Sequence, residues 1–133
     1  MDEAVVRGAL ADHGLTFRAG HTVIGTIRPG VGAYRNGLAS TMGLMKDHVL
    51  SFAREGLAII PMADLNGALV EEHMVVLKNG DIKELRMRMK RLHFELVVTT
   101  DAGPMIYTLR KRVIGCPWHR ENLALMLSEA TTG

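Results

Sequence analysis

Cysteine, proline and aromatic residues are scarce in this 133-residue chain, which has one Cys, four Pro, one Trp, two Tyr and three Phe. The single cysteine, Cys116, excludes an intramolecular disulfide, and a chain without such bridges is typical of a reducing compartment. A domain of this length buries roughly two-thirds of its unfolded surface, so neither a disulfide nor a metal is needed for a stable core. We therefore expect one domain over residues 1–133, with no resident metal or cofactor.

Long apolar runs and a large charge excess are also missing. No run approaches the ~18 apolar residues that span a bilayer, and the acidic opening MDE lacks the basic start of a signal peptide. These features predict a cytoplasmic protein with no transmembrane segment. Sixteen Lys and Arg against fourteen Asp and Glu give a formal charge of +2, far below the basicity of a dedicated nucleic-acid binder. Any affinity for phosphate must come from local clustering.

The N-terminal third contains a predicted helix, a predicted strand and a glycine-rich segment. Apolar residues recur at helical spacing over residues 2–13, and Gly14 follows, where a left-handed residue commonly ends a helix. The β-branched alternation from His21 to Arg28 predicts a strand, which Pro29 would end. Residues 30–45 contain four glycines and are interpreted as a structural loop added to the domain, as is the N-terminal helix.

Three further elements follow from local patterns. VLSFA, the turn-like REG and LAIIPM predict a hairpin that begins after His48. MVVLK leads into Asn79-Gly80, a pair that favours a second hairpin because both residues tolerate positive φ. Pro117 suits the first position of a C-terminal helix that would lie on the sheet as a lid. Its apolar side would carry Leu123, Met126, Leu127 and Ala130, with Trp118 and Leu125 at the edge.

The stretch IKELRMRMKRLHFELVV, residues 82–98, fits two patterns. As a helix it has an apolar stripe at spacings of three and four, formed by Ile82, Leu85, Met89, Leu92 and Leu96. As strands it has apolar residues at odd positions before Lys90 and at even positions after Arg91, which a reversal at these two residues would produce. We favour strands, because the stretch ends in β-rich LVVTT. Lys90 and Arg91 are unfavourable residues for a two-residue turn of type I′ or II′, so a longer loop at this reversal is the alternative.

This reversal predicts a register. It pairs Met89 with Leu92, Met87 with Phe94, and Leu85 with Leu96, and it places both methionines in the core. A second reversal over Asp101–Pro104 pairs Val98 with Tyr107 and Leu96 with Leu109. The opposite face would then carry two polar rows, one of Arg86, Glu95 and Arg110 and the other of Arg88, His93 and Arg112.

Several antiparallel strands closed by one C-terminal amphipathic helix describe the pleckstrin-homology-like architecture. The stretches HVLSFAREGLAIIPM, GDIKELRMRMKRLHFELVVTTDAG and VIGCPWHRENLALML, within residues 46–130, resemble the bacterial pleckstrin-homology-like family of small uncharacterised proteins. The resemblance implies a mainly β (α+β) fold, in which a partly open antiparallel β-barrel is capped by the C-terminal helix. It also implies a module for protein contacts or assembly, and it transfers no catalytic residue.

Motifs for chemistry are weak. GAYRNGLAS has the glycine spacing of a phosphate loop, but Leu38 stands where a lysine must reach the phosphates. Cys116 and His119 have the spacing of two metal ligands, yet no companion pair exists, and a buried thiol is the favoured interpretation. No catalytic residue is assigned. An enzyme with a site around Gly32 and Ser40 is the weakest hypothesis.

The basic residues of the sheet are the best candidate contact site: Arg86, Arg88, Arg110 and Arg112. Their guanidinium groups suit phosphate or carboxylate oxygens. Glu95 would neutralise part of the charge, and no aromatic side chain is predicted on that face to stack bases. The leading hypothesis is therefore a non-enzymatic pleckstrin-homology-like module that acts through protein contacts or self-association. The alternative is an anionic-ligand binder that recognises lipid headgroups or nucleic acid through the four arginines.

Overall fold

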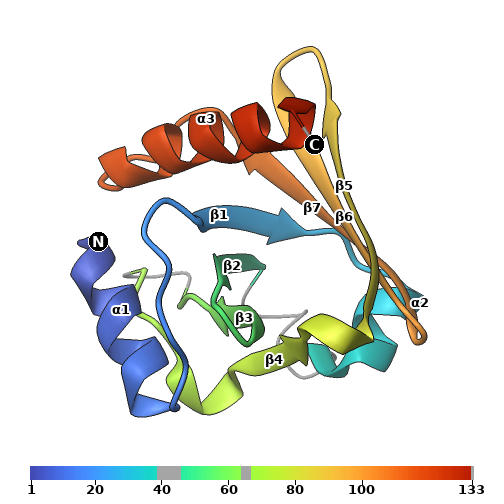
Figure 1. Ribbon diagram of the computed structural model, residues 1–133, viewed down its shortest axis with the longest axis horizontal. Coiled ribbons are helices and arrows are strands. Elements are labelled where there is room, and N and C mark those ends of the chain that lie inside the picture. The colour runs from blue at the N-terminus through green and yellow to red at the C-terminus, as the bar shows by residue number, and fades with distance from the viewer. Residues whose placement is uncertain (39–45, 64–66, 133) are drawn as a thin grey trace.

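Within the described residues, seven strands form one antiparallel sheet, with a helix near each end of the chain (Figure 1). The computed structural model describes residues 1–38, 46–63 and 67–132. The α-helices are α1 (Glu3–Asp12), α2 (Val31–Ala33) and α3 (Pro117–Thr132), and short helical turns are formed by Tyr34–Leu38, Glu71–His73 and Asn79–Asp81. The strands are β1 (Thr22–Ile27), β2 (Asp47–Phe52), β3 (Gly56–Pro61), β4 (Val75–Lys78), β5 (Ile82–Met89), β6 (His93–Thr100) and β7 (Gly103–Arg110).

The order of the strands in the sheet is β4-β3-β2-β1-β7-β6-β5. Two meanders, β1 to β4 and β5 to β7, are joined where Thr26 pairs with Thr108 and Ile27 pairs with Tyr107. The sheet does not close, so β4 and β5 are its two edge strands. The predicted class is confirmed: the protein is mainly β, of the α+β type, with a C-terminal helix and a short N-terminal helix. No helix in the described ranges is long and apolar enough to cross a membrane.

Local patterns placed several elements correctly. Helix α1 begins after Asp2, whose carboxylate accepts a hydrogen bond of 3.1 Å from the Ala4 N–H, and Gly14 has a φ of 72° just past its end. The predicted hairpin between β2 and β3 is confirmed, with Phe52 opposite Leu57 across the turn. Of the glycine-rich segment, residues 30–38 are described and are largely helical, whereas residues 39–45, including Ser40, lie outside the described residues.

Strands β1 to β3 are largely buried, with packing on both faces of the sheet. One face of β1 and β2 packs against the second meander and α3, in a core that includes Val23, Leu50, Leu96, Tyr107 and Leu123. The other face packs against α1, in a core that includes Val6, Leu10, Ile24, Val49 and Trp118. All six residues of β3 are buried. In the second meander only β6 is mostly buried, and β5 is mostly exposed.

The predicted hairpin at Asn79-Gly80 is wrong. Strand β4 pairs with β3, and β5 pairs with β6, so the two strands that flank these residues lie at opposite edges of the sheet. Neither residue has a positive φ. Asn79 instead contacts the turn between β2 and β3, because its side-chain amide donates 2.9 Å to the Arg54 carbonyl and its backbone N–H donates 3.2 Å to the Glu55 carbonyl.

The strand interpretation of residues 82–98 is confirmed, and its register is corrected by two residues. Met89 faces Phe94 and Met87 faces Leu96, because the reversal is centred on Arg91-Leu92 and not on Lys90-Arg91. The Lys90 N–H closes this turn by donating 2.9 Å to the His93 carbonyl. At the second reversal Thr100 faces Gly103, so the turn is Asp101-Ala102. Both shifts keep the residues that remain in the strands on their predicted faces, whereas Leu92 lies in the turn and Arg112 lies beyond β7.

Candidate functional site

Strand β5 has a backbone edge that pairs with no other described strand. It is eight residues long, whereas β4 at the opposite edge has four. Because Lys90 is hydrogen-bonded to His93 of β6, alternation directs the backbone groups of the even residues of β5 toward β6. The N–H and C=O groups of Leu85, Met87 and Met89 therefore point away from the sheet, where another strand could bind them.

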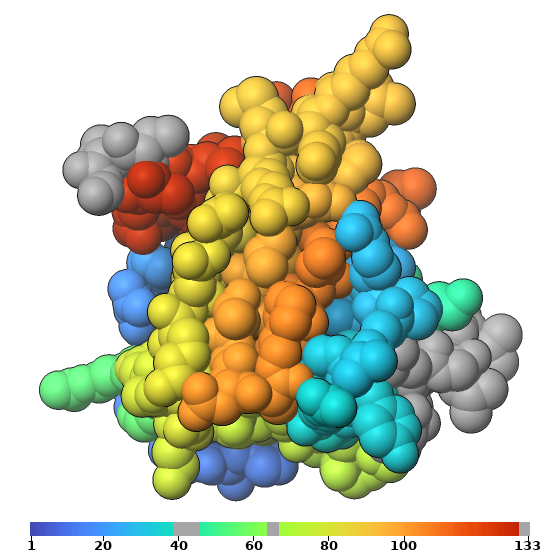
Figure 2. Space-filling model, turned by 90° about the vertical axis from the view of Figure 1, so that its right-hand side faces the viewer, coloured from blue at the N-terminus to red at the C-terminus, as the bar shows by residue number. Residues whose placement is uncertain are grey.

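The same strand exposes large apolar side chains. Leu85 is 48% exposed, Met89 is 79% exposed, and Leu92 at the tip of the turn is 77% exposed. Met87 is partly buried against the core, as predicted. The prediction that Met89 fills the core is wrong, because the β5–β6 hairpin projects beyond the body of the molecule (Figure 2). Exposed apolar residues that gather beside a free edge are typical of a surface that contacts another chain.

A groove of about 350 Å³ lies between β5 and α3. Its apolar wall is formed by Phe52, Leu85, Met87, Leu96, Met126 and Ala130. At its polar rim, His21 Nε2 lies 2.9 Å from Glu129 Oε2 and 3.3 Å from Arg18 Nη2. The groove and the free edge of β5 are continuous through Leu85 and Met87. We call them together the β5 surface.

Charge on the β5 surface is distributed unevenly along the strand. Lys83 and Glu84 lie in its first half, whereas Arg86, Arg88 and Lys90 lie in the second half and just after it. Arg86 Nη2 is 3.1 Å from Glu84 Oε1, and both side chains are about half exposed. Such an exposed pair contributes ~0 to 1 kcal/mol, so both groups can exchange it for another partner at little cost.

Glu95 lies at the centre of the basic side of the sheet. Its side chain is only 6% exposed, and its Oε2 accepts a hydrogen bond of 2.6 Å from Arg28 Nη2. Lys90 Nζ is 3.7 Å from Glu95 Oε1, and Arg88 faces Glu95 across the strands. Desolvation raises the pKa of this carboxyl, but the hydrogen bond from Arg28 and the charges of Lys90, Arg28 and Arg88 outweigh it, so the pKa lies below the ordinary 4.5.

The corrected register separates the four predicted arginines. Arg86 faces Val97, Arg88 faces Glu95, and Arg110 faces His93. Arg112 lies beyond the end of β7. The predicted rows of Arg86, Glu95 and Arg110 and of Arg88, His93 and Arg112 therefore do not form. Arg88, Glu95 and Thr108 form one row instead, and His93 and Arg110 belong to the next.

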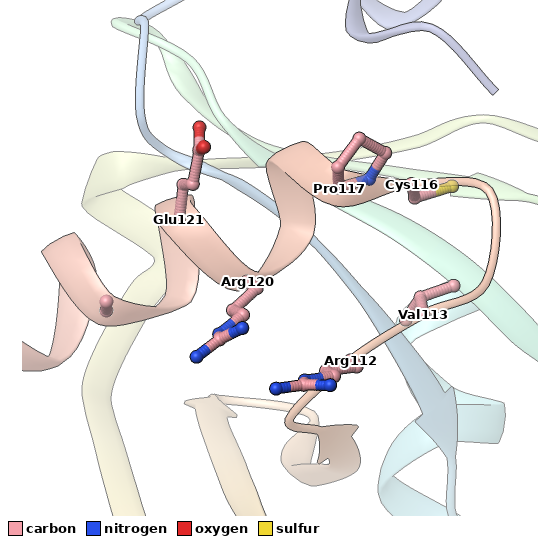
Figure 3. Close-up of a pocket in the computed structure, with 7 residues that line it drawn as sticks. Arg112, Val113, Cys116, Pro117, Arg120 and Glu121 are labelled. Carbon is pink, nitrogen blue, oxygen red and sulfur yellow. The ribbon is translucent and has the colours of Figure 1, made fainter.

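Arg112 lines a second cavity, of about 540 Å³, at the start of α3. Arg120 and Glu121 line it as well. Both guanidinium groups reach to the same side of the helix, whereas the Glu121 side chain points to the other side (Figure 3). Neither arginine forms an ion pair with another residue in the part of the chain that the structure describes. Sequence reasoning missed Arg120 as a neighbour of Arg112. It also missed Arg28 as the partner of Glu95. In both cases the two residues come from different elements, and no local pattern indicates that these elements lie close together.

Cys116 and His119 do not form a metal site. Cys116 is 4% exposed and packs in the core beneath α1. His119 Nδ1 accepts a hydrogen bond of 3.0 Å from the Ile24 N–H, which leaves Nε2 to donate 2.6 Å to the Arg110 carbonyl. Burial lowers the pKa of His119, against the smaller opposite effect of the bond to Arg110. Across the described residues, no group of three or more His, Cys, Asp or Glu could hold a metal ion.

The glycine-rich segment packs against β7. A Cβ on Gly32 would lie 1.9 Å from the Pro104 carbonyl oxygen, so close approach of two backbones explains this glycine. Asn36 fixes the segment further, since its side-chain amide donates 2.7 Å to the Gly32 carbonyl and its Oδ1 accepts 2.7 Å from the Thr100 hydroxyl. The described part of this segment is therefore accounted for by packing.

Taken together, these features define an α+β protein built on an open antiparallel sheet, with one free apolar edge and one arginine-lined cavity. Comparison of the chain with protein-family models, curated proteins and solved structures found no match. Its function is therefore inferred from these two surfaces.

Proposed function

We propose that the protein is a non-enzymatic interaction module of pleckstrin-homology-like fold that binds another protein chain along the β5 surface. The observation that carries the proposal is the combination on one strand of outward backbone groups and exposed apolar side chains, of which Met89 is 79% exposed. Each outward N–H and C=O can pair with an added strand, and the adjoining groove can take the side chains of that strand. Burial of exposed apolar area supplies most of the driving force.

The proposal is tested with a double variant, Leu85→Lys with Met89→Lys, which places charge on the β5 surface. Val76→Lys is the matched control, because Val76 is 39% exposed on the opposite edge strand. Circular dichroism and thermal melting establish that both variants fold. Quantitative mass spectrometry then compares the protein partners bound by immobilised wild-type protein, double variant and control. Light scattering measures the molar mass of each of the three proteins in solution. Partner binding or self-association that is lost only in the double variant supports the proposal, and equal behaviour of all three proteins overturns it.

A second candidate function, the binding of an anionic ligand, is favoured by the cavity that holds Arg112 and Arg120. Two unpaired guanidinium groups that share one cavity repel each other, and a phosphate or carboxylate between them would relieve this repulsion. Arg86, Arg88 and Arg110 lie elsewhere on the sheet and would contribute only long-range attraction.

Co-sedimentation with liposomes distinguishes the two candidates. If the second function is correct, the protein is retained on anionic vesicles at low salt, released near physiological salt, and not retained on neutral vesicles. The variant Arg112→Glu with Arg120→Glu then loses retention, and Arg86→Glu with Arg88→Glu weakens it less. Absence of retention at low salt, together with no binding of a short oligonucleotide, rejects anion binding and leaves the β5 surface as the functional one.

A further inference from the structure

We infer that β5 pairs antiparallel with β5 of a second copy of this chain, with Leu85 on the two-fold axis. The inference rests on the proposed function, because it names the partner of the β5 surface. It is carried by the backbone direction of β5, by the order of charges along the strand and by the position of its apolar side chains.

Backbone direction restricts the possible pairings. Leu85 and Met87 direct their N–H and C=O groups away from β6. In a symmetric antiparallel pair, a residue on the two-fold axis faces its own copy, and the side chains of facing residues lie on the same face of the sheet. Whenever the two-fold axis passes through a residue of β5, the apolar face of the sheet in one copy is therefore continuous with the apolar face in the other.

Charge then selects the register. If the axis passed through Glu84, Arg86 or Arg88, that residue would face its own copy, and like charges directly opposite each other are destabilising. If the axis passed through Met87, Arg86 of each copy would face Arg88 of the other. With Leu85 on the axis, Glu84 of each copy faces Arg86 of the other, and the two such pairs attract. Within residues 84 to 88, this is the only centre that opposes no like charges.

The remaining basic residues do not prevent this pairing. Arg88 of one copy lies six residues along the joined strands from Arg88 of the other, about 20 Å at the usual rise per residue. That separation exceeds the ~8 Å screening length at physiological ionic strength. Arg88 and Lys90 also face or contact Glu95 within their own copy, which offsets part of their charge.

Apolar contacts complete the interface. On the groove side, Leu85 faces its own copy across the two-fold axis. Leu85 and Met87 line the groove beside α3 in each copy. Pairing of the two β5 strands therefore brings the apolar residues of the second copy next to the groove of the first. A bulge in the pairing with β6 falls between Ile82 and Glu84, so the regular strand around the axis begins at Glu84.

A disulfide test locates the axis. The chain has one cysteine, and Cys116 is buried, so unmodified protein is the control for background cross-linking. In Leu85→Cys the two new thiols lie on the axis, within the ~5.5 Å Cα separation that suits a disulfide. In Met89→Cys, the matched variant on the same strand, the two Cα atoms are about 27 Å apart. Met89 is the more exposed of the two, so random collision would favour the control. We expect at least tenfold faster dimer formation at position 85, and equal or faster formation at position 89 overturns the inference.

A charge-exchange test is independent of cysteine. Both positions are about half exposed, so Glu84→Arg and Arg86→Glu should fold, which circular dichroism checks. Each variant alone opposes like charges at two places, and its dimer should weaken about tenfold or more. When the two variants are mixed, each arginine of one faces a glutamate of the other. We expect light scattering to show a species of twice 14.6 kDa in the wild type and in the mixture, but in neither variant alone. If the mixture stays monomeric while the wild type dimerises, the Leu85-centred pairing is wrong.

The outcome also separates this inference from the proposed function. If the wild-type protein is monomeric at every working concentration, while the double lysine variant loses a different protein partner, then self-pairing is overturned and the proposed function stands. If neither self-association nor any partner depends on the β5 surface, both are overturned.

Discussion

Arg28 and Glu95 form an ion pair of 2.6 Å that joins the end of β1 to the middle of β6. The Glu95 side chain is 6% exposed and the Arg28 side chain is 53% exposed, so the acid is buried against the sheet while the base remains in contact with water. Because a buried carboxylate without a partner is costly, this pair stabilises the packing of the two meanders, which meet where β1 pairs with β7.

The first prediction concerns acid stability. The pKa of Glu95 is lower in the folded than in the unfolded state, so the carboxylate stabilises the fold above pH 4.5 and this contribution is lost as the pH falls through the folded-state value. Below pH 4.5, the free energy of unfolding of Glu95→Gln, measured by urea denaturation, should therefore decrease less steeply with falling pH than that of the wild type. Glu72→Gln, on the exposed turn before β4, is the control. Identical slopes for Glu95→Gln and the wild type would contradict the assignment.

The second prediction concerns the buried hydrogen bond of 2.8 Å between the Tyr107 hydroxyl and His48 Nδ1. Both side chains are fully buried, and burial raises the pKa of Tyr107, so the hydroxyl stays protonated. Tyr107→Phe should lower the free energy of unfolding by about 1 to 3 kcal/mol. Tyr34→Phe, at a position 66% exposed, should change it by less than about 0.5 kcal/mol. Similar losses for both variants in chemical denaturation would refute the difference.

The third prediction concerns two glycines in contrasting surroundings. Gly32→Ala pushes a methyl group against the Pro104 carbonyl and should destabilise the protein by about 1 to 3 kcal/mol. Gly8→Ala lies within α1, with no atom within 4 Å of the added carbon, and should stabilise it by up to about 1 kcal/mol. Thermal denaturation of the two variants beside the wild type gives the signs, and a stabilising Gly32→Ala would show that the backbones can separate.

The fourth prediction concerns the protonation of His119. Because burial lowers its pKa, the folded protein keeps this ring neutral below pH 6.5, where the unfolded chain takes up the proton. Stability linked to His119 is thus complete above pH 6.5 and declines as the pH falls below it. Nuclear magnetic resonance should find the proton on Nε2 at pH 7 and a titration midpoint below 6.5. A midpoint at or above 6.5 would contradict the dominant effect of burial on the pKa of His119.

Local patterns predicted most elements, because their information lies within a few residues. Gly14 at the end of α1, the alternation of β1 and the apolar stripe of α3 all belong to this class. The predicted strand register was wrong by two residues at both turns of the second meander. A shift of two residues leaves each strand side chain on the same face, so the alternation of apolar and polar residues does not distinguish the two registers. Only turn geometry distinguishes these registers, and Arg91-Leu92 is an unusual turn pair.

The candidate site was predicted less completely than the fold. The exposure of Arg86 and Arg88 was anticipated, since charged residues alternate with apolar ones along β5. The proximity of Arg120 to Arg112, and of Arg28 to Glu95, depends on the packing of α3 and on the pairing of β1 with β7. The partners Thr26 and Thr108 are separated by most of the chain, and no period in the sequence indicates that they meet.

The pairing of β1 with β7 has a consequence for the order in which the chain folds. Every other strand pair joins neighbours in sequence, so each meander can form by closing loops much shorter than the one between β1 and β7. The contact of Thr26 with Thr108 closes a loop of about eighty residues, and it gains little until both meanders exist. We therefore expect the rate-limiting barrier to lie at the docking of the two meanders. Substitutions at this seam would then slow folding more than equally destabilising substitutions within either hairpin.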